Sequence, residues 1–328
     1  MSEEKRLLNV SPSPHFRSND TVTGIMLDVI IAMIPSLIAS TYIFGFRALL
    51  VTAVSVLSCV GFEYLSRKVM KRHNTLADLS AVVTGMLLAF NLPVDIPIPM
   101  VIIGAAVAII VAKQFFGGIG QNFVNPALVG RIVLMVSFPV QMSKYGTPFA
   151  WNKSEVDALS TATPLQKLAN GEGGLPKLTD MLLGLRPGAL GEVCAVALLL
   201  GFCYLLIRRV IKPTIPLCFI GTVAVIMLIA GKGDLTFVGY EVLSGGLLLG
   251  AIFMATDYTT SPVNFKGQVI FAVGCGIITS VIRLFGSLPE GVSFSIILMN
   301  ILVPQIEKFT TPKPFGTVKE KKVKEAAK

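Results

Sequence analysis

Long apolar stretches separated by short polar ones dominate the chain. A membrane-spanning helix needs about 20 mainly apolar residues, or fewer where the helix is short or broken. The stretches that approach this length lie at residues 22–40, 45–64, 78–92, 97–113, 126–140, 188–208, 214–230, 239–256, 267–285 and 290–308. The pattern therefore predicts an all-α polytopic membrane protein with about ten transmembrane helices.

Two short sequences of the first half recur in the second half. GMLLAFNLP at 85–93 resembles GLLLGAIFM at 246–254, and FGGIG at 116–120 resembles FGSLP at 285–289. Each half would then hold five spans, an odd number, so the halves would cross the membrane in opposite directions. We accordingly expect two inverted five-helix repeats, which bind ligands at their interface. The alternative is chance similarity, because apolar helices resemble one another easily.

The amino-acid composition indicates that lipid is the solvent. Hydrophobic residues make up 53% of the 328 residues, charged residues make up only 14%, and the mean hydropathy is +0.74. A soluble protein has about 25% charged residues. The first twenty residues are polar and contain no apolar core, so we expect no cleavable signal peptide.

The distribution of Lys and Arg predicts the orientation in the membrane. The net charge is +9, but the basic residues flank apolar segments, which favours membrane topology over nucleic-acid binding. If the N-terminus is cytoplasmic, 20 of the 28 basic residues face the cytoplasm, and five of the other eight lie in one long loop. The predicted parts are a cytoplasmic N-terminal segment (1–21), a first transmembrane half (22–140), an outer loop (141–187), a second transmembrane half (188–308) and a basic cytoplasmic tail (309–328).

The cysteines and histidines argue against a metal centre in this chain. The five cysteines lie mostly in apolar runs and form no CxxC, so we interpret them as packing residues. The two histidines, His15 and His73, lie outside the apolar segments. We therefore expect no metal site, neither haem nor zinc nor a self-contained iron–sulfur cluster.

Two polar sequences interrupt the apolar pattern at corresponding places in the two halves. They are KQFFGGIGQNFVNPA at 113–127 and MATDYTTSPVNFKG at 254–267. Backbone groups freed at such a break need side chains, water or a ligand as partners. Each sequence either lines a cavity that holds a cofactor or ion, or is an ordinary turn at a helix end. The candidate binding residues are Lys113, Gln114, Gly117, Gly118, Asn122, Asn125, Asp257 and Thr259.

Four acidic residues lie inside or at the ends of predicted spans. Charges in such places are costly, and they mark ion paths by default. Asp28 would lie about 9 Å into the first helix at 1.5 Å per residue, and Glu192 would lie about one turn inside the sixth. We interpret these two as candidates for ion coupling, and Glu63 and Glu241 as helix-end charges that reach water.

The sequence STATPL at 160–165 gathers three hydroxyl residues just before a proline on the predicted outer loop. Pro164 biases Thr163 toward an extended backbone, which would present its hydroxyl to another molecule. No Lys or Arg adjoins the cluster, so covalent modification is a better interpretation than the binding of a free phosphate. A solvated Ser/Thr loop is the alternative.

Taken together, these sequences resemble one family. STATPL resembles the [S/T]-G-A-[S/T] signature at which a flavin transferase attaches FMN to threonine through a phosphoester. The family comprises the D subunits of Rnf complexes, which are membrane ferredoxin:NAD oxidoreductases, and the homologous B subunits of sodium-pumping NADH:quinone reductases. The quinone-reductase subunits usually carry a longer N-terminal extension. Only about twenty residues precede the first span here, and this length favours the Rnf subunit. Four other sequences resemble further signatures of the same family. They are KQFFGGIGQNFVNPA (113–127), PGALGEVCA (187–195), FMATDYTTSP (253–262) and LMNILVP (298–304).

The resemblance implies a flavin on the outer loop and another near the cytoplasm. Thr163 takes the place of the FMN-bearing threonine, in covalent phosphoester linkage. Ser160 and Ala162 match the signature, and Thr161 stands where glycine is usual, which makes it a rival acceptor. A second, non-covalent flavin, riboflavin, is implied on the cytoplasmic side, with the interrupted sequences as candidates for its pocket. Pro164 and Leu165 complete the motif.

The resemblance also implies the function and the partners. The chain would relay electrons in a translocase-type ferredoxin:NAD oxidoreductase without being catalytic alone, coupled to Na⁺ or H⁺ translocation. Implied partners are a membrane pair of subunits, an FMN-bearing G-type subunit, soluble B- and C-type redox subunits and a flavin transferase. The expected location is a bacterial or archaeal cytoplasmic membrane. The alternatives are a component of a sodium-pumping quinone reductase and a cofactor-free solute channel or transporter.

Overall fold

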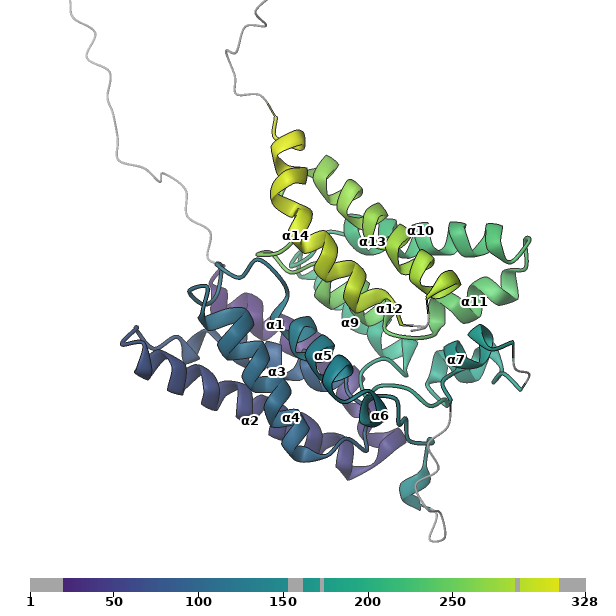
Figure 1. The fold of residues 1–328 in the computed structure, drawn as a ribbon, viewed down its shortest axis with the longest axis horizontal. Helices are drawn as coiled ribbons and strands as arrows, with labels where there is room; N and C mark the ends of the chain where they lie inside the picture. The colour runs from purple at the N-terminus through teal and green to yellow at the C-terminus, as the bar shows by residue number, and fades with distance from the viewer. Residues whose placement is uncertain (1–19, 153–161, 172–173, 287–289, 313–328) are drawn as a thin grey trace, which may run out of the picture.

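The described part of the chain is helical and contains no β-strand. The structure is a computed structural model that describes residues 20–152, 162–171, 174–286 and 290–312. Figure 1 shows the helices of the first half, purple to teal, beside those of the second half, green to yellow. The predicted all-α class is confirmed within these residues.

Local sequence explains where the helices of the first half begin and end. Thr21 caps the first helix by accepting a hydrogen bond from the Gly24 N–H. Gly45 separates the first two helices with a φ of 77°, which glycine adopts without a steric penalty. Asn125 and Pro126 start the fifth α-helix as cap and first residue. The elements are α1 (Val22–Phe44), α2 (Phe46–Val69), η1 (Leu76–Asp78), α3 (Ser80–Phe90), α4 (Ile98–Ala106), the π-helix η2 (Val107–Gln114), α5 (Pro126–Ser137), α6 (Pro139–Met142) and η3 (Ala150–Asn152).

The second half repeats the use of short capped helices between long ones. Asp234 accepts hydrogen bonds from the Thr236 hydroxyl and N–H at 2.6 and 2.8 Å, and these bonds hold the pKa of Asp234 below its usual range. The elements are α7 (Pro164–Ala169), α8 (Leu178–Leu183), α9 (Ala195–Ile207), α10 (Thr214–Ala230), α11 (Leu235–Leu243), α12 (Leu247–Leu249), the π-helix η4 (Gly250–Met254), α13 (Phe265–Phe285) and α14 (Val292–Thr310).

Long apolar helices identify the chain as a multi-pass membrane protein. Within the described residues, α1, α2, α13 and α14 are long and apolar enough to cross a bilayer. A fifth span results if α11 and the helix Leu247–Met254, which meet at a bend of 63°, count as one. Each of the other five predicted stretches contains a shorter apolar helix of 10–17 residues. Length and composition thus support four or five spans, fewer than the ten expected.

The sixth predicted span begins later than its hydropathy suggests. Residues 188–194 are not helical, with a turn at 190–192, and α9 begins only at Ala195. The reason is tertiary, because the N–H groups of Leu190 and Gly191 donate to the carbonyls of Leu92 and Phe90 at the end of α3. This segment therefore pairs with another chain segment instead of continuing its own helix.

Close approaches of helix backbones hold the bundle together, both within each half and between the halves. In the first half α2 packs on α3 and α4, and in the second half α13 packs on α10 and α14. Helix α1 packs on α9 across the two halves. A Cβ at Gly201 of α9 would overlap the Ala32 carbonyl oxygen, and one at Gly85 would lie 2.7 Å from the Val56 Cα. Glycine at these positions allows contacts that a larger residue would prevent.

The loops gather at two ends of the helix bundle. At one end, the start of α1 and the loops after η2 and η4 border one cavity together with Val210 and Ile211. At the other end, the Phe149 N–H donates to the Ile43 carbonyl, and Tyr145 bonds to Glu290. The first group contains loops predicted to face the cytoplasm, and the second contains loops predicted to face outward.

Candidate functional site

A cavity of about 390 Å³ lies between the two halves of the chain. Its walls come from α1, α3, η2, α9 and η4, together with the loops that follow η2 and η4. Most of the lining is apolar, with Ile25, Met26, Val83, Leu87 and Phe253 among the wall residues. Ligand pockets in proteins have volumes of about 300–1,000 Å³ and the same mixture of apolar walls and a few polar groups.

The two polar sequences that interrupt the apolar pattern, 113–127 and 254–267, meet at this cavity. Asn125 caps α5, and its side-chain Nδ2 donates to the Met254 carbonyl at 3.2 Å, which joins the first interrupted sequence to η4. Among the eight candidate binding residues, those that line the cavity are Lys113, Asn122, Asn125, Asp257 and Thr259.

The other three candidates shape the cavity from behind. Gly117 and Gly118 have φ angles of 127° and 107°, which only glycine adopts readily. A Cβ at Gly118 would also overlap Arg67 Nη2. The Gln114 side chain is fully buried and donates to Glu63 at 3.0 Å. These residues therefore fix the path of the loop, and none of them is in the cavity wall.

Each of the two polar sequences, 113–127 and 254–267, begins in the last residues of a π-helix. Val107–Gln114 and Gly250–Met254 both have π geometry, and Lys113 lies at the end of the first. A π-helix widens the backbone and is frequent at functional sites. The helical geometry thus changes where the two halves border the cavity.

Asp257 is the acidic group of the cavity wall. It lies in the loop after η4, and its carboxylate accepts hydrogen bonds from the Thr259 and Thr260 hydroxyls at 2.9 and 3.2 Å. Burial raises the pKa of Asp257, whereas these hydrogen bonds lower it, and burial is the larger effect. The loop holds the carboxylate in place before any ligand is present.

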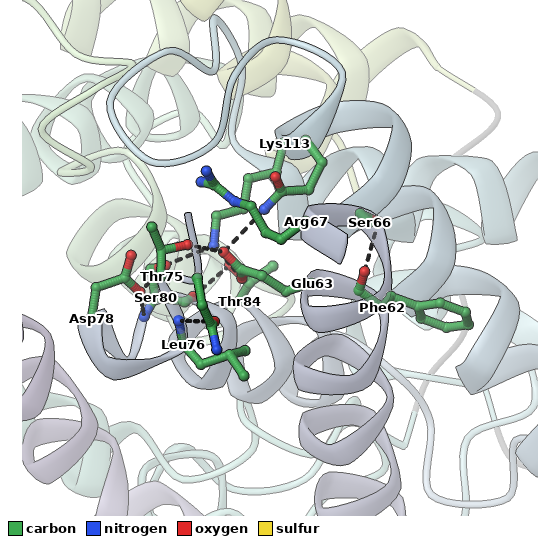
Figure 2. Close-up of polar contacts among 12 residues, drawn as sticks. Phe62, Glu63, Ser66, Arg67, Thr75, Leu76, Asp78, Ser80, Thr84 and Lys113 are labelled. Carbon is green, nitrogen blue, oxygen red and sulfur yellow. Dashed lines mark hydrogen bonds and ion pairs between the residues drawn. The ribbon is translucent and has the colours of Figure 1, made fainter. Parts of the chain in front are cut away.

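A buried ion pair joins Lys113 in the cavity wall to Glu63 behind it (Figure 2). Lys113 Nζ lies 2.8 Å from Glu63 Oε2 and donates to the Ser80 hydroxyl at 2.7 Å. Glu63 Oε1 accepts from Thr75 Oγ1 at 3.2 Å and from Gln114 Nε2 at 3.0 Å. The interpretation of Glu63 as a charge that reaches water is wrong, because its side chain is 0% exposed.

Glu241 is also buried, near the other end of the bundle. Arg283 Nη1 donates to the Glu241 carboxylate at 3.1 Å and to its carbonyl at 2.5 Å, and Arg283 Nη2 donates to the Ser244 carbonyl at 3.2 Å. The interpretation of Glu241 as a helix-end charge in water is therefore wrong. The pair instead holds the break between α11 and α12 in place.

A second polar cluster at this end joins the two halves. Arg131 of α5 forms an ion pair with Glu290, and it donates to Asn91 Oδ1 at 2.5 Å. Tyr145 donates to the other oxygen of Glu290 at 3.2 Å. Arg131 is one of the 20 basic residues that the charge pattern counts on the cytoplasmic side, but it is buried inside a helix and pairs across the bundle. Helix packing, and not the surface charge, decides its position.

Glu192 lies beside this cluster, in the turns before α9 and not inside the helix. Its Oε1 accepts from the Ala189 N–H at 3.2 Å, and its Oε2 has no hydrogen-bond partner within the described residues. Arg186 donates to the Glu192 carbonyl at 2.9 Å. Burial raises the pKa of the Glu192 carboxyl to about 7, aided by the nearby charge of Glu290.

Asp28 lies at the opposite end of the bundle from Glu192. Tyr204 donates to its carboxylate at 2.8 Å, and Arg208 forms an ion pair with it at 3.2 Å. The side chain of Asp28 is 13% exposed and that of Arg208 is 58% exposed. The structure therefore does not bring the two candidate ion-coupling residues together, but leaves one at each end.

Thr163 has the extended backbone that its position before Pro164 predicts, with φ −65° and ψ 155°. It caps α7, because its hydroxyl accepts from the Gln166 N–H while the Gln166 side chain accepts from the Thr163 N–H. The expectation that Thr163 presents its hydroxyl to another molecule does not hold in this structure, since Thr163 is only 4% exposed. Ala162, Pro164 and Leu165 are within the structure, whereas Ser160 and Thr161 lie outside the described residues.

Comparison with known proteins gives the family. The family described as NQR2, RnfD, RnfE matches residues 9–316. The chain belongs to this family. It is 45% identical to the D subunit of the Na⁺-translocating ferredoxin:NAD⁺ oxidoreductase complex of Acetobacterium woodii, over 96% of this chain and 97% of the relative.

Other relatives in this family have related names. The chain is 43% identical to the D subunit of the proton-translocating ferredoxin:NAD⁺ oxidoreductase complex of Clostridium ljungdahlii, over 96% of this chain and 98% of the relative. It is 36% identical to the D subunit of the ion-translocating oxidoreductase complex of Stutzerimonas stutzeri, over 90% and 92%. The two relatives of 45% and 43% identity are named for different ions.

Sequence reasoning missed the buried ion pairs of this family member. Lys113–Glu63 and Arg131–Glu290 join residues that are 50 and 159 positions apart, so no local pattern reveals the pairing. One signal was present, because a Lys or Arg within an apolar segment needs a buried partner.

Proposed function

We propose that the chain is the D subunit of an ion-translocating ferredoxin:NAD oxidoreductase complex, and that it relays electrons through flavins. Identity of 45% and 43% over nearly the whole length to two proteins with that name carries the proposal. The chain is then an enzyme subunit of translocase type, which works with partner subunits and is not catalytic alone. The partners it requires are membrane and soluble redox subunits and a flavin transferase.

The first flavin is FMN, attached to Thr163 through a phosphoester. The sequence STATPL supports this assignment, and the extended backbone of Thr163 suits an enzyme that binds the segment as a strand. The hydroxyl is buried and accepts the Gln166 N–H, so the transferase has to open the start of α7 before it reaches Oγ1. Attachment would therefore occur before α7 has packed or while α7 is open.

The second flavin, riboflavin, occupies the cavity between the halves. A volume of about 390 Å³, apolar walls and a few amide, hydroxyl and charged groups fit an isoalloxazine ring with a polar chain. The bound flavin would supply reversible electron transfer. Val83, Leu87 and Phe253 would exclude water from the ring, and Asn122 and Thr259 would orient it by hydrogen bonding.

Ion translocation involves Asp28 and Glu192 in this proposal. The two carboxylates lie at opposite ends of the bundle, one beside exposed Arg208 and one buried with an unpartnered oxygen in the described residues. They would suit entry and exit points of an ion path. The coupling ion is Na⁺ or H⁺, as in the names of the two relatives.

Two inverted repeats and a fixed orientation complete the proposal. Each half has a buried cation near the end of its fourth predicted segment, Lys113 in the first half and Arg283 in the second, and this correspondence supports the repeats. Both termini would be cytoplasmic, with the Thr163 loop on the outer face of a bacterial or archaeal cytoplasmic membrane.

The test is a comparison of Thr163→Ala with Thr161→Ala, each expressed beside a flavin transferase. We expect the denatured wild-type chain to fluoresce as a flavoprotein on a gel, and its intact mass to exceed the bare mass by one esterified FMN. Thr163→Ala should lose both signals, because it lacks the acceptor oxygen, and Thr161→Ala should keep them. A bare wild-type mass would contradict the covalent flavin and favour a cofactor-free transporter.

A further inference from the structure

Lys113 lies between the cavity and Glu63. Lys113 and Ser80 both line the cavity, and Lys113 Nζ donates to the Ser80 hydroxyl at 2.7 Å. Glu63 does not line the cavity and is 0% exposed, with its Oε2 2.8 Å from Lys113 Nζ (Figure 2). The ion pair is therefore a dipole whose positive end is nearer to the cavity.

The ammonium group retains hydrogen-bonding capacity for a ligand. A lysine ammonium has three N–H donors. Within the described residues, Lys113 Nζ donates to Glu63 and Ser80, which leaves one donor without a protein acceptor. An acceptor on a molecule in the cavity would complete the set.

Glu63 holds the Lys113 ammonium in place. A carboxylate beside a buried ammonium offsets the cost of burying the charge. Both oxygens of Glu63 are fixed, one by Lys113 and the other by Gln114 and Thr75. Three separate segments, α2, the turn at Thr75 and the end of η2, thus position one charge.

We propose that Lys113 contacts the flavin in the cavity, and that Glu63 is a positioning residue whose ion pair with Lys113 raises the flavin's reduction potential. This inference rests on the proposed second flavin. Reduction adds negative charge to the ring, and a nearby ammonium stabilises that charge more strongly in an apolar cavity than in water. Because Glu63 is farther from the cavity, its opposing effect on the ring is smaller.

The chain offers a matched control in Arg283–Glu241. This pair has the same net charge and is also buried, with side chains 1% and 6% exposed. It does not line the cavity. Neutralising it should perturb helix packing to a similar extent without changing the charge next to the flavin.

The experiment uses the full chain with Thr163→Ala, so that only a non-covalent flavin absorbs. The midpoint potential is measured by spectroscopic redox titration in Lys113→Met/Glu63→Gln and in the control Arg283→Met/Glu241→Gln. We expect the first to weaken the preference for reduced over oxidised flavin at least tenfold, a fall of about 30 mV for a two-electron couple. The control should keep the potential of the parent chain.

Two further variants separate contact from folding. Lys113→Arg keeps the cation and should keep the potential near that of the parent chain. Glu63→Gln should also shift the midpoint potential, because it removes the carboxylate that holds the Lys113 ammonium in place. The contact between Lys113 and the flavin is also supported if Lys113→Met/Glu63→Gln loses its flavin with an unchanged unfolding temperature while the control variant keeps its flavin.

The outcomes distinguish this inference from the proposed function. If acid extraction of the parent chain releases no riboflavin, the second flavin is wrong and the inference fails with it. If riboflavin is present but the pair variant keeps the parent potential, or the control shifts it equally, only the role of Lys113 and Glu63 is overturned.

Discussion

At the scale of single residues, the buried charges of this protein are held by partners from distant segments. Glu63, Glu241 and Glu290 each pair with a lysine or arginine. Removing one partner of a buried ion pair costs about 3–5 kcal/mol, because the other charge is left buried without a partner. Glu192 differs from the other three, because one of its oxygens has no partner in the described residues.

Glu192 should make the stability of the protein depend on pH. Its pKa in the folded state, about 7, is above the ordinary 4.5, so the folded state binds the proton more tightly than the unfolded state. The stability from the protonated form is fully present below about pH 4.5 and is lost as the pH rises through about 7. Glu192→Gln mimics the protonated form and should remove this loss.

The measurement is the unfolding temperature of the detergent-solubilised protein at pH 5 and pH 8. The wild type should lose more stability than Glu192→Gln between the two values. Asp28→Asn serves as a control, because Asp28 already has an ion-pair partner. If wild type and Glu192→Gln lose the same amount of stability between pH 5 and pH 8, burial does not raise the pKa of Glu192 as assigned.

At the scale of elements, helix breaks and close helix contacts position the cavity. The π-helices η2 and η4 precede the two polar loops, and Asn125 ties one loop to the end of η4. Gly201 lets α9 approach the backbone of α1, and both helices contribute wall residues to the cavity. The cavity thus depends on contacts between elements that are far apart in sequence.

Gly201→Ala should destabilise the protein by about 1–3 kcal/mol, the usual cost of overpacking. The added methyl group would overlap the Ala32 carbonyl oxygen, so α1 and α9 would have to separate. Gly221→Ala in α10 is the matched control, since nothing lies within 4 Å of its Cβ position. Unfolding in detergent would measure both, and equal stability of the two variants would contradict the close packing of α1 on α9.

At the scale of the whole molecule, the chain folds into two side-by-side halves (Figure 1), and residues of both halves line the cavity. The loops after η2 and η4, which the charge pattern assigned to the cytoplasm, border the cavity together, whereas Tyr145 and Phe149 of the loop assigned to the outside contact Glu290 and Ile43. This grouping agrees with an orientation in which Lys144 and Lys212 lie on opposite sides of the membrane. Both residues are exposed, so they can report on the orientation.

Single cysteines at these two positions should label from opposite sides. In a chain whose five native cysteines are replaced by serine, Lys144→Cys should react with a membrane-impermeant maleimide in intact cells. Lys212→Cys should react only after the cells are broken, because the positive-inside distribution places it in the cytoplasm. The reverse result would invert the topology and move Thr163 to the cytoplasmic side.

The sequence by itself determined the membrane class, the helical character, the position of the apolar segments and the motifs of the family. Hydropathy and turn residues are local properties, so a short stretch predicts a helix, a break or an extended threonine without knowledge of the fold. The boundary at residues 188–194 was missed because hydrogen bonds to the end of α3 override the local pattern there.

Only the tertiary structure decided which charges face water and which are paired in the interior. Lys113 and Glu63 are 50 positions apart, Arg131 and Glu290 159, and Asp28 and Arg208 180. Such partners meet only when helices pack, and the free energy of a buried charge depends on the partner that packing supplies. For the same reason the cavity between the halves, and the place of Lys113 in its wall, belong to the fold and not to any single segment.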